Sequence, residues 1–203
     1  MWLGTNSGLK SWDGYDFHNF RSTAFSPGIL PNNTVLSITE DNNKILWLGT
    51  RNGLARFDMK TRSFNTLFIE GDSYRTIYTL YTSTDGTVWI GTDGGLTRYD
   101  ENTHKFDTYT EKNSIYLDSD GKKSADRHIS VKSIIDDGHG NLYLGTWSDG
   151  VLIFNPKKRT FQRYEKINNF NSAYSLHLDS KGRLWIGSWS EGLQMIPNPE
   201  QGP

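Results

Sequence analysis

Two short segments of the chain combine an aromatic ring with a carboxylate. The first reads Trp-Ser-Asp at positions 147–149, and the second reads Trp-Ser-Glu at positions 189–191. An indole ring covers the apolar C–H face of a sugar, and a carboxylate beside it accepts hydrogen bonds from the sugar hydroxyl groups. This pairing predicts a surface that binds an oligosaccharide ligand. The predicted ligand contacts in these segments are Trp147, Asp149, Trp189 and Glu191.

Both tryptophans also have a purely structural interpretation. A tryptophan in a turn often covers the edge of a hydrophobic core. In that case Trp147 and Trp189 fold back, pack on a neighbouring turn and contact no ligand. The sequence leaves these two alternatives open.

Two further segments carry polar and aromatic side chains that are not repeated elsewhere in the chain. The longer segment covers residues 110–130, and the shorter one covers residues 70–75. Long connections in compact folds are often functional. We predict that four of their side chains belong to the same ligand-binding surface. These are Tyr74, Arg75, Arg127 and His128.

The residue types that carry most enzyme chemistry are absent or scattered. The chain has no Cys, which excludes disulfides, zinc–thiolate sites and cysteine nucleophiles. Its 5 His occupy unrelated positions, and no Ser-His-Asp order, metal-binding His pair or phosphate-binding loop is present. The acids near Asp118 lack the further ligands of a calcium loop. We predict no catalytic residue, no metal and no cofactor, with a glycan hydrolase or lyase as the enzyme alternative.

Charge and composition narrow the class of partner. The formal net charge is −1, with 22 Lys and Arg against 23 Asp and Glu. Nucleic acids and anionic membranes attract a basic excess, so neither is a predicted partner. No apolar run is long enough to span a bilayer, and no signal peptide is present. Aromatic residues make up 13% of the 203 residues and Gly contributes 20, a composition typical of short strands joined by tight turns.

The elements that would position these side chains are repeated along the chain. The motif Trp-Leu/Ile-Gly-Thr/Ser, with Tyr for Trp in one copy, is followed by a turn and Gly-Leu/Val. Its copies begin at Trp2, Trp47, Trp89, Tyr143 and Trp185, which are 45, 42, 54 and 42 residues apart. This period is typical of a four-stranded propeller blade. The repeated aromatic and glycine residues are expected to pack between blades rather than to bind a ligand.

Each complete repeat predicts four strands, which we name a to d in chain order. The repeats predict an all-β chain of β-propeller blades, each with four antiparallel strands. About five blades are expected, three of them complete, as an open arc or fragment of a larger propeller. The expected single domain covers 1–203, with blade units at about 1–25, 30–69, 74–110, 128–166 and 171–197.

Blade topology also predicts where the ligand contacts lie. The turns between strands b and c and the connections between strand d and the next strand a share one face of a propeller. Both Trp-Ser-acid segments are b–c turns of adjacent blades, so they are expected side by side. The segments 70–75 and 110–130 are d–a connections and are expected on the same face.

The segment from Leu30 to Phe64 carries the complete repeat pattern. It contains Leu-Pro-Asn-Asn-Thr-Val-Leu-Ser-Ile from Leu30 and Leu-Trp-Leu-Gly-Thr-Arg-Asn-Gly-Leu from Leu46. This pattern resembles the two-component regulator propeller repeat, which forms the periplasmic sensor region of bacterial hybrid histidine kinases. The resemblance covers nearly the whole chain and implies a homodimeric receptor, an oligosaccharide ligand and further blades outside this chain.

Two non-enzymatic hypotheses follow. In the first, the chain is part of an extracytoplasmic sensor that recognises an oligosaccharide and signals to a cytoplasmic kinase. In the second, these blades only support or dimerise the receptor, and the ligand binds elsewhere.

Overall fold

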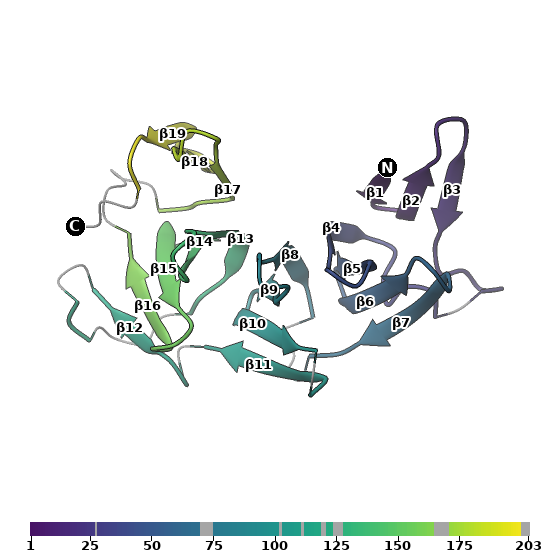
Figure 1. Ribbon diagram of the computed structural model, residues 1–203, viewed down its shortest axis with the longest axis horizontal. Coiled ribbons are helices and arrows are strands. Elements are labelled where there is room, and N and C mark those ends of the chain that lie inside the picture. The colour runs from purple at the N-terminus through teal and green to yellow at the C-terminus, as the bar shows by residue number, and fades with distance from the viewer. Residues whose placement is uncertain are drawn as a thin grey trace. The chain divides into compact units, whose positions relative to one another are not determined.

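The computed structural model describes residues 1–26, 28–69, 75–101, 103–110, 112–118, 121–123, 128–164 and 171–199. Within these ranges the regular secondary structure is β-strand, arranged in five sheets (Figure 1). Two sheets have four strands, two have three, and one has five. The predicted all-β blades are therefore confirmed.

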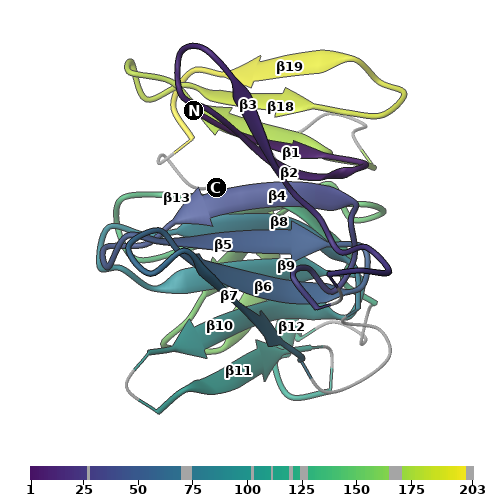
Figure 2. The ribbon, with the colours of Figure 1, turned by 90° about the vertical axis from the view of Figure 1, so that its right-hand side faces the viewer.

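The strands follow the repeat of the sequence. The first sheet contains β1 (Trp2–Thr5), β2 (Gly8–Trp12) and β3 (Phe17–Phe20). The second contains β4 (Val35–Glu40), β5 (Ile45–Thr50), β6 (Gly53–Asp58) and β7 (Ser63–Leu67). The third contains β8 (Ile77–Thr82), β9 (Val88–Thr92), β10 (Gly95–Asp100) and β11 (Lys105–Tyr109). Figures 1 and 2 show the second sheet in the order β4, β5, β6 and β7.

The last two sheets complete the series. The fourth contains β13 (Val131–Asp136), β14 (Leu142–Thr146), β15 (Val151–Asn155) and β16 (Thr160–Arg163), and the fifth contains β17 (Ser175–Leu178), β18 (Leu184–Gly187) and β19 (Leu193–Ile196). Among the described residues, three sheets contain strands a to d, whereas the first and the last each contain three strands.

The fourth sheet has an additional strand within the segment that the sequence predicts as a long connection. Strand β12 (Ile115–Leu117) pairs in parallel with β16, and Tyr116 at its centre is buried. Three residues are too few to show the alternation by which a strand is recognised in a sequence. Part of this connection therefore extends the outer edge of a blade.

The chain forms two compact units. The first contains residues 1–93 and 98–107, and the second contains residues 94–97 and 108–203. The boundary passes through β10 and β11.

Strand b is the buried centre of each complete blade. All residues of β9 and β14 are buried, as are five of the six residues of β5. A strand paired on both edges and covered on both faces reads as a continuous apolar run. This explains why the Trp-Leu-Gly-Thr motif does not alternate between polar and apolar residues.

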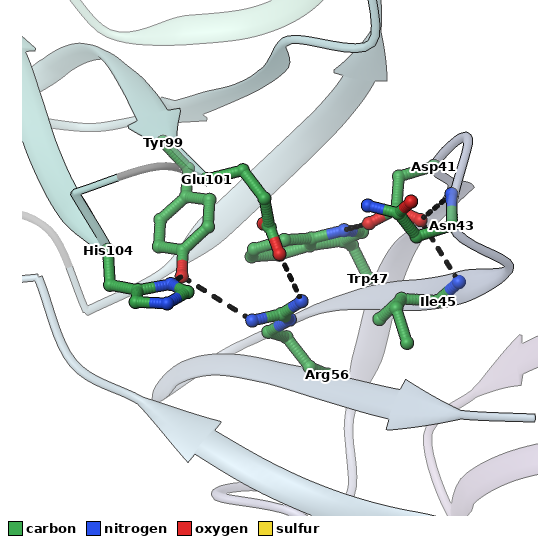
Figure 3. A network of polar contacts seen from close by, with 8 residues as sticks. All are labelled: Asp41, Asn43, Ile45, Trp47, Arg56, Tyr99, Glu101 and His104. Carbon is green, nitrogen blue, oxygen red and sulfur yellow. Dashed lines mark hydrogen bonds and ion pairs between the residues drawn. The ribbon is translucent and has the colours of Figure 1, made fainter.

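An aspartate in the turn before strand b fixes the tryptophan that begins the motif. The Oδ1 atom of Asp41 accepts hydrogen bonds from the backbone N–H groups of Asn43 (2.8 Å) and Ile45 (3.0 Å). Its Oδ2 atom accepts one from Nε1 of Trp47 at 2.8 Å (Figure 3). Asp179 makes the same contact with Trp185 at 3.0 Å. The aspartate thus accepts hydrogen bonds both from the backbone N–H groups of the turn and from the N–H group of the buried indole.

In the first unit, Trp47 packs between the second and third blades, as predicted for the repeated aromatic residue. Its ring lies 4.8 Å from the ring of Tyr99, and the Arg56 guanidinium lies 4.8 Å from the Trp47 ring centroid. Arg56 also donates to Oη of Tyr99 (3.4 Å) and to Oε1 of Glu101 (3.1 Å) (Figure 3). The second blade is thereby joined to the third by rings and an ion pair.

In the second unit, Gly145 allows the last blade to approach strand b of the fourth. A Cβ atom at this position would lie 2.6 Å from the carbonyl oxygen of Ala173. We expect Gly145→Ala to lower the free energy of unfolding by about 1–3 kcal/mol, because backbone must move to relieve the overlap. The matched control is Gly187→Ala, whose nearest neighbour is Oγ of Ser175 at 3.1 Å. Equal losses of stability in urea denaturation would contradict this account of Gly145.

Tyr164 gives the second unit a specific sensitivity to alkaline pH. Its ring is buried beside Tyr143, and its Oη donates to the carbonyl oxygen of Pro199 at 3.3 Å. Burial raises the pKa of Tyr164 to about 12, whereas an unfolded tyrosine has a pKa of about 10. The unfolded state therefore loses the Tyr164 proton at a lower pH than the folded state does. The stability contributed by the protonated Tyr164 is complete below about pH 10 and is lost as the pH rises to about 12. When the pH is raised from about 10 to about 12, the free energy of unfolding of Tyr164→Phe should fall less than that of the unmodified chain, as measured by parallel urea titrations.

Candidate functional site

A β-bulge in strand a interrupts the pairing of three blades at the same position. The register shifts between Val35 and Ser37 in β4, between Ile77 and Thr79 in β8, and between Val131 and Ser133 in β13. A bulge leaves one residue without a pairing partner and re-aims its side chain. The residues that the strand register skips are Leu36, Tyr78 and Lys132. Tyr174 holds the corresponding position before β17, because Ser175 pairs with Gly187 as Ser133 pairs with Gly145.

The bulge residue meets the first residue of the b–c turn in its own blade. In the third blade, Oη of Tyr78 donates to Oδ2 of Asp93 at 2.8 Å. In the fourth, Nζ of Lys132 lies 5.8 Å from the ring centroid of Trp147. In the fifth, the ring of Tyr174 lies 5.5 Å from that of Trp189. Each of these three blades thus has a pair of contacting side chains at positions where the residue types are not fixed by the repeat motif.

The last two of these pairs join in the second unit to form a cluster of three rings. Trp147 lies 5.8 Å from Tyr174 and 6.4 Å from Trp189, measured between ring centroids. The exposed fractions are 49% for Trp147, 38% for Tyr174 and 71% for Trp189. We call these three residues the aromatic platform. The tryptophans therefore lie beside one another as expected for adjacent blades, and the structure leaves their rings accessible to solvent.

The backbone segment 171–174 holds the platform together. The carbonyl oxygen of Asn171 accepts a hydrogen bond from the N–H of Gly150 (2.9 Å), and the N–H of Ala173 donates to the carbonyl oxygen of Thr146 (2.8 Å). The N–H of Tyr174 donates to the carbonyl oxygen of Gly187 at 2.7 Å. This segment thus bonds to both flanking blades, which fixes Tyr174 between the two tryptophans.

The two acids of the Trp-Ser-acid turns are placed differently. Asp149 is only 4% exposed, and its backbone N–H donates to Oγ1 of Thr146 at 3.0 Å. Glu191 is exposed, and its Oε2 atom accepts hydrogen bonds from the hydroxyl groups of Ser188 and Ser172. Ser172 also accepts the backbone N–H of Trp189 at 3.3 Å. Glu191 therefore presents an oriented carboxylate beside the platform, whereas the Asp149 side chain is enclosed.

Two of the four remaining predicted contacts are among the residues that the structure describes. His128 is an exposed residue of the second unit. Arg75 is an exposed residue of the first unit, and its carbonyl oxygen accepts the N–H of Gly53 at 2.6 Å. Tyr74 and Arg127 lie outside the described residues. Their predicted contacts with a ligand stay predictions.

Tyr174 and Lys132 were not among the contacts predicted from the sequence, although both lie beside the b–c turns. A signal for them exists in the sequence. The residues on either side of the bulge recur, Val, Ile or Ala before it and Ser or Thr after it, while the residue between them is Leu, Tyr, Lys and Tyr in the four blades. A variable residue between recurrent neighbours marks a position that the scaffold does not need.

Within the described part of the chain, no helix is long and apolar enough to cross a membrane. The same residues contain no group of three His, Asp or Glu side chains suited to hold a metal ion.

Comparison with known families identifies the repeat. The family model of the two component regulator propeller matches residues 29–52, 71–94 and 169–190. These ranges overlap the second, third and fifth blades. These three segments are two-component regulator propeller repeats. Comparison with curated proteins gives no match.

Solved structures share the fold of this repeat chain. The extracellular domain of a protein described as a hybrid two component system from B. thetaiotaomicron has a TM-score of 0.79 at 20% identity, with 96% of this chain and 26% of that chain covered. The extracellular domain of a one component system from the same organism gives a TM-score of 0.75 at 24% identity, with coverages of 96% and 25%. Virginiamycin B lyase from Staphylococcus aureus gives a TM-score of 0.57 at 16% identity, with coverages of 83% and 58%. The chain thus spans about a quarter of the two extracellular domains.

Proposed function

We propose that this chain belongs to the extracytoplasmic, ligand-sensing propeller of a two-component sensor and binds an oligosaccharide on the aromatic platform. The observation that carries the proposal is the contact among three exposed rings, Trp147, Tyr174 and Trp189. The sensor is non-enzymatic in this segment, and the periplasm is its compartment.

The platform has the chemical features that sugar binding requires. Exposed aromatic rings in contact offer a large apolar surface, and apolar surface stacked on sugar C–H groups is removed from water. Because backbone hydrogen bonds and ring contacts already fix Tyr174, little side-chain entropy is lost on binding. Glu191 supplies a hydrogen-bond acceptor whose orientation is set by Ser188 and Ser172.

The comparisons support the sensor role at the level of the family. The repeat is named for two-component regulators, and two of the structures with this fold are extracellular domains of one- and two-component systems. Signalling then requires a ligand that binds one arrangement of the receptor better than another. We propose that the arrangement is that of two protomers, which passes the signal to a cytoplasmic kinase.

A glycan array probed with the purified chain tests this proposal. We expect retention of at least one oligosaccharide, with affinity then measured by isothermal titration calorimetry. Tyr174→Ala should raise the dissociation constant about tenfold or more, because the ring joins the two tryptophans. Tyr78→Ala is the matched control, since Tyr78 occupies the same bulge position in the first unit. A well-folded chain that retains no glycan would favour the scaffold hypothesis.

The same samples address the enzyme alternative. The similarity to virginiamycin B lyase is a similarity of fold, at 16% identity, and assigns no lyase activity to this chain. If the bound oligosaccharide is recovered intact after prolonged incubation, binding without turnover is supported. Release of shorter or unsaturated products would contradict the sensor assignment for this segment.

A further inference from the structure

The two tryptophans of the aromatic platform occupy the same position in adjacent blades. Each follows the Gly-Thr/Ser end of its motif, and each begins a Trp-Ser-acid-Gly turn of the same length. The two turns, 146–150 and 188–192, also close in the same way. In each of them, the N–H of the first residue donates to the carbonyl oxygen of the last residue at 2.9 Å. Trp147 and Trp189 are therefore equivalent side chains on equivalent turns.

The equivalence of the two positions explains why their rings are inclined to each other. Neighbouring blades of a propeller are related by a rotation about a common axis, so equivalent side chains are rotated as well. The ring planes of Trp147 and Trp189 make an angle of 49°. The ring of Tyr174 makes angles of 70° with Trp147 and 44° with Trp189. The platform thus consists of inclined faces and is not flat.

Hydrogen bonds to the backbone fix this inclination. The N–H of Trp147 donates to the carbonyl oxygen of Ser130 at 3.1 Å, and the N–H of Trp189 donates to Oγ of Ser172 at 3.3 Å. Tyr174 is held by its own N–H group and contacts both indoles. A ligand that matches the inclination is therefore bound with little loss of side-chain entropy. A ligand that requires another inclination must first break these contacts.

Oligosaccharides differ in the inclination of their successive sugar rings. Glucose units joined by β-1,4 linkages form a flat ribbon, in which the mean planes of the rings are nearly parallel. Glucose units joined by α-1,4 or β-1,3 linkages form a coiled chain, in which the ring planes are inclined to one another. The apolar area that an indole removes from water is largest when its plane is parallel to the C–H face of a sugar. Two inclined indoles therefore stack at the same time only on a coiled chain.

We propose that the aromatic platform selects a coiled oligosaccharide over a flat one. This inference rests on the proposed oligosaccharide binding and names the class of oligosaccharide. A coiled chain places one sugar on Trp147 and another on Trp189, whereas a flat chain stacks on one of the two indoles at a time. Specificity is a difference between two affinities, so the second stacked ring decides the preference.

Three hexaoses of glucose test this inference, because they differ only in linkage. Maltohexaose (α-1,4) and laminarihexaose (β-1,3) are coiled, and cellohexaose (β-1,4) is flat. We expect one or both coiled hexaoses to bind at least about tenfold more tightly than cellohexaose in calorimetric titrations, as expected for one further aromatic anchor. The coiled hexaose that binds more tightly identifies the linkage. If the glycan array selects another sugar, coiled and flat linkage isomers of that sugar replace the glucose hexaoses in the same comparison.

Single variants of the tryptophans show whether both indoles are used. Trp147→Ala and Trp189→Ala should each weaken binding of the preferred coiled hexaose about tenfold or more. Each should change the affinity for cellohexaose much less, because a flat chain can stack on the indole that remains. The preference for the coiled chain should therefore fall in both variants. Tyr78→Ala, in the first unit, is the control and should keep both the affinity and the preference.

The indole N–H signals in the NMR spectrum of the ¹⁵N-labelled chain locate the binding. We expect the preferred coiled hexaose to shift the signals of both Trp147 and Trp189. If cellohexaose binds as tightly as the coiled hexaoses and loses affinity in Tyr174→Ala, the inference is overturned and the proposed function stands. A coiled hexaose whose affinity is the same in both alanine variants also overturns the inference. A folded chain that retains no glycan at all contradicts the inference and the proposed function together.

Discussion

Replacing Trp47 by alanine should lower the free energy of unfolding of the first unit by about 3–5 kcal/mol, the usual cost of removing a buried tryptophan. Trp47 is fully buried and is the largest side chain enclosed in this way. The substitution removes the ring contact with Tyr99 and the surface on which the Arg56 guanidinium lies. It also leaves the Asp41 carboxylate without its indole donor. One ring contact between the second and third blades and two contacts within the second blade are lost together.

Two control variants divide this loss into its parts. Trp47→Phe keeps a ring but removes the Nε1 donor, so it should cost less than Trp47→Ala, by an amount that reflects the retained packing. Trp189→Ala removes a tryptophan that is 71% exposed and should change stability by less than about 0.5 kcal/mol. Urea denaturation followed by far-UV circular dichroism measures all three. If Trp47→Ala were as mild as Trp189→Ala, Trp47 would not hold the blades together.

The double variant Trp147→Ala/Trp189→Ala should lose at least about 100-fold in affinity for a bound oligosaccharide, since aromatic anchors of binding sites each contribute about 2 kcal/mol or more. Both rings contact Tyr174 but little of the core, being 49% and 71% exposed. The fold should therefore survive. Calorimetric titration of the glycan selected on the array gives the affinity, and circular dichroism reports the fold.

A second double variant serves as the control for ring chemistry. Trp147→Phe/Trp189→Phe retains aromatic faces of smaller area and should bind with intermediate affinity. If the alanine double variant is folded and binds normally, the platform is not the ligand site. The blades would then act as the scaffold of a receptor whose ligand binds elsewhere.

The bulge in strand a explains how a repeated scaffold can carry a non-repeated surface. The residues that pair with strand b recur because they pack between blades, whereas the bulge residue is released from the ladder. Leu36, Tyr78, Lys132 and Tyr174 can therefore differ without cost to the sheet. The surface presented by each blade can change independently of the fold.

The sequence by itself determined the blades. The spacing of the Trp/Tyr-Leu/Ile-Gly-Thr/Ser motif predicted four-stranded blades, and each copy of the motif lies in a strand, namely β1, β5, β9, β14 and β18. This was possible because each blade is a local structure, in which consecutive strands pair through short turns. Residues such as Asp41, Gly145 and Trp47 have roles that repeat along the chain, so each copy supports the interpretation of the others.

Only the tertiary structure decided which side chains meet and which stay exposed. Tyr174 joins the two tryptophans because segment 171–174 bonds to both flanking blades, a contact that spacing does not reveal. Asp149 and Glu191 hold equivalent positions in their motifs, yet one is enclosed and the other exposed. The sequence repeat determines the backbone of each blade. The exposure and the contacts of a side chain depend on neighbours that the fold brings together from distant parts of the chain.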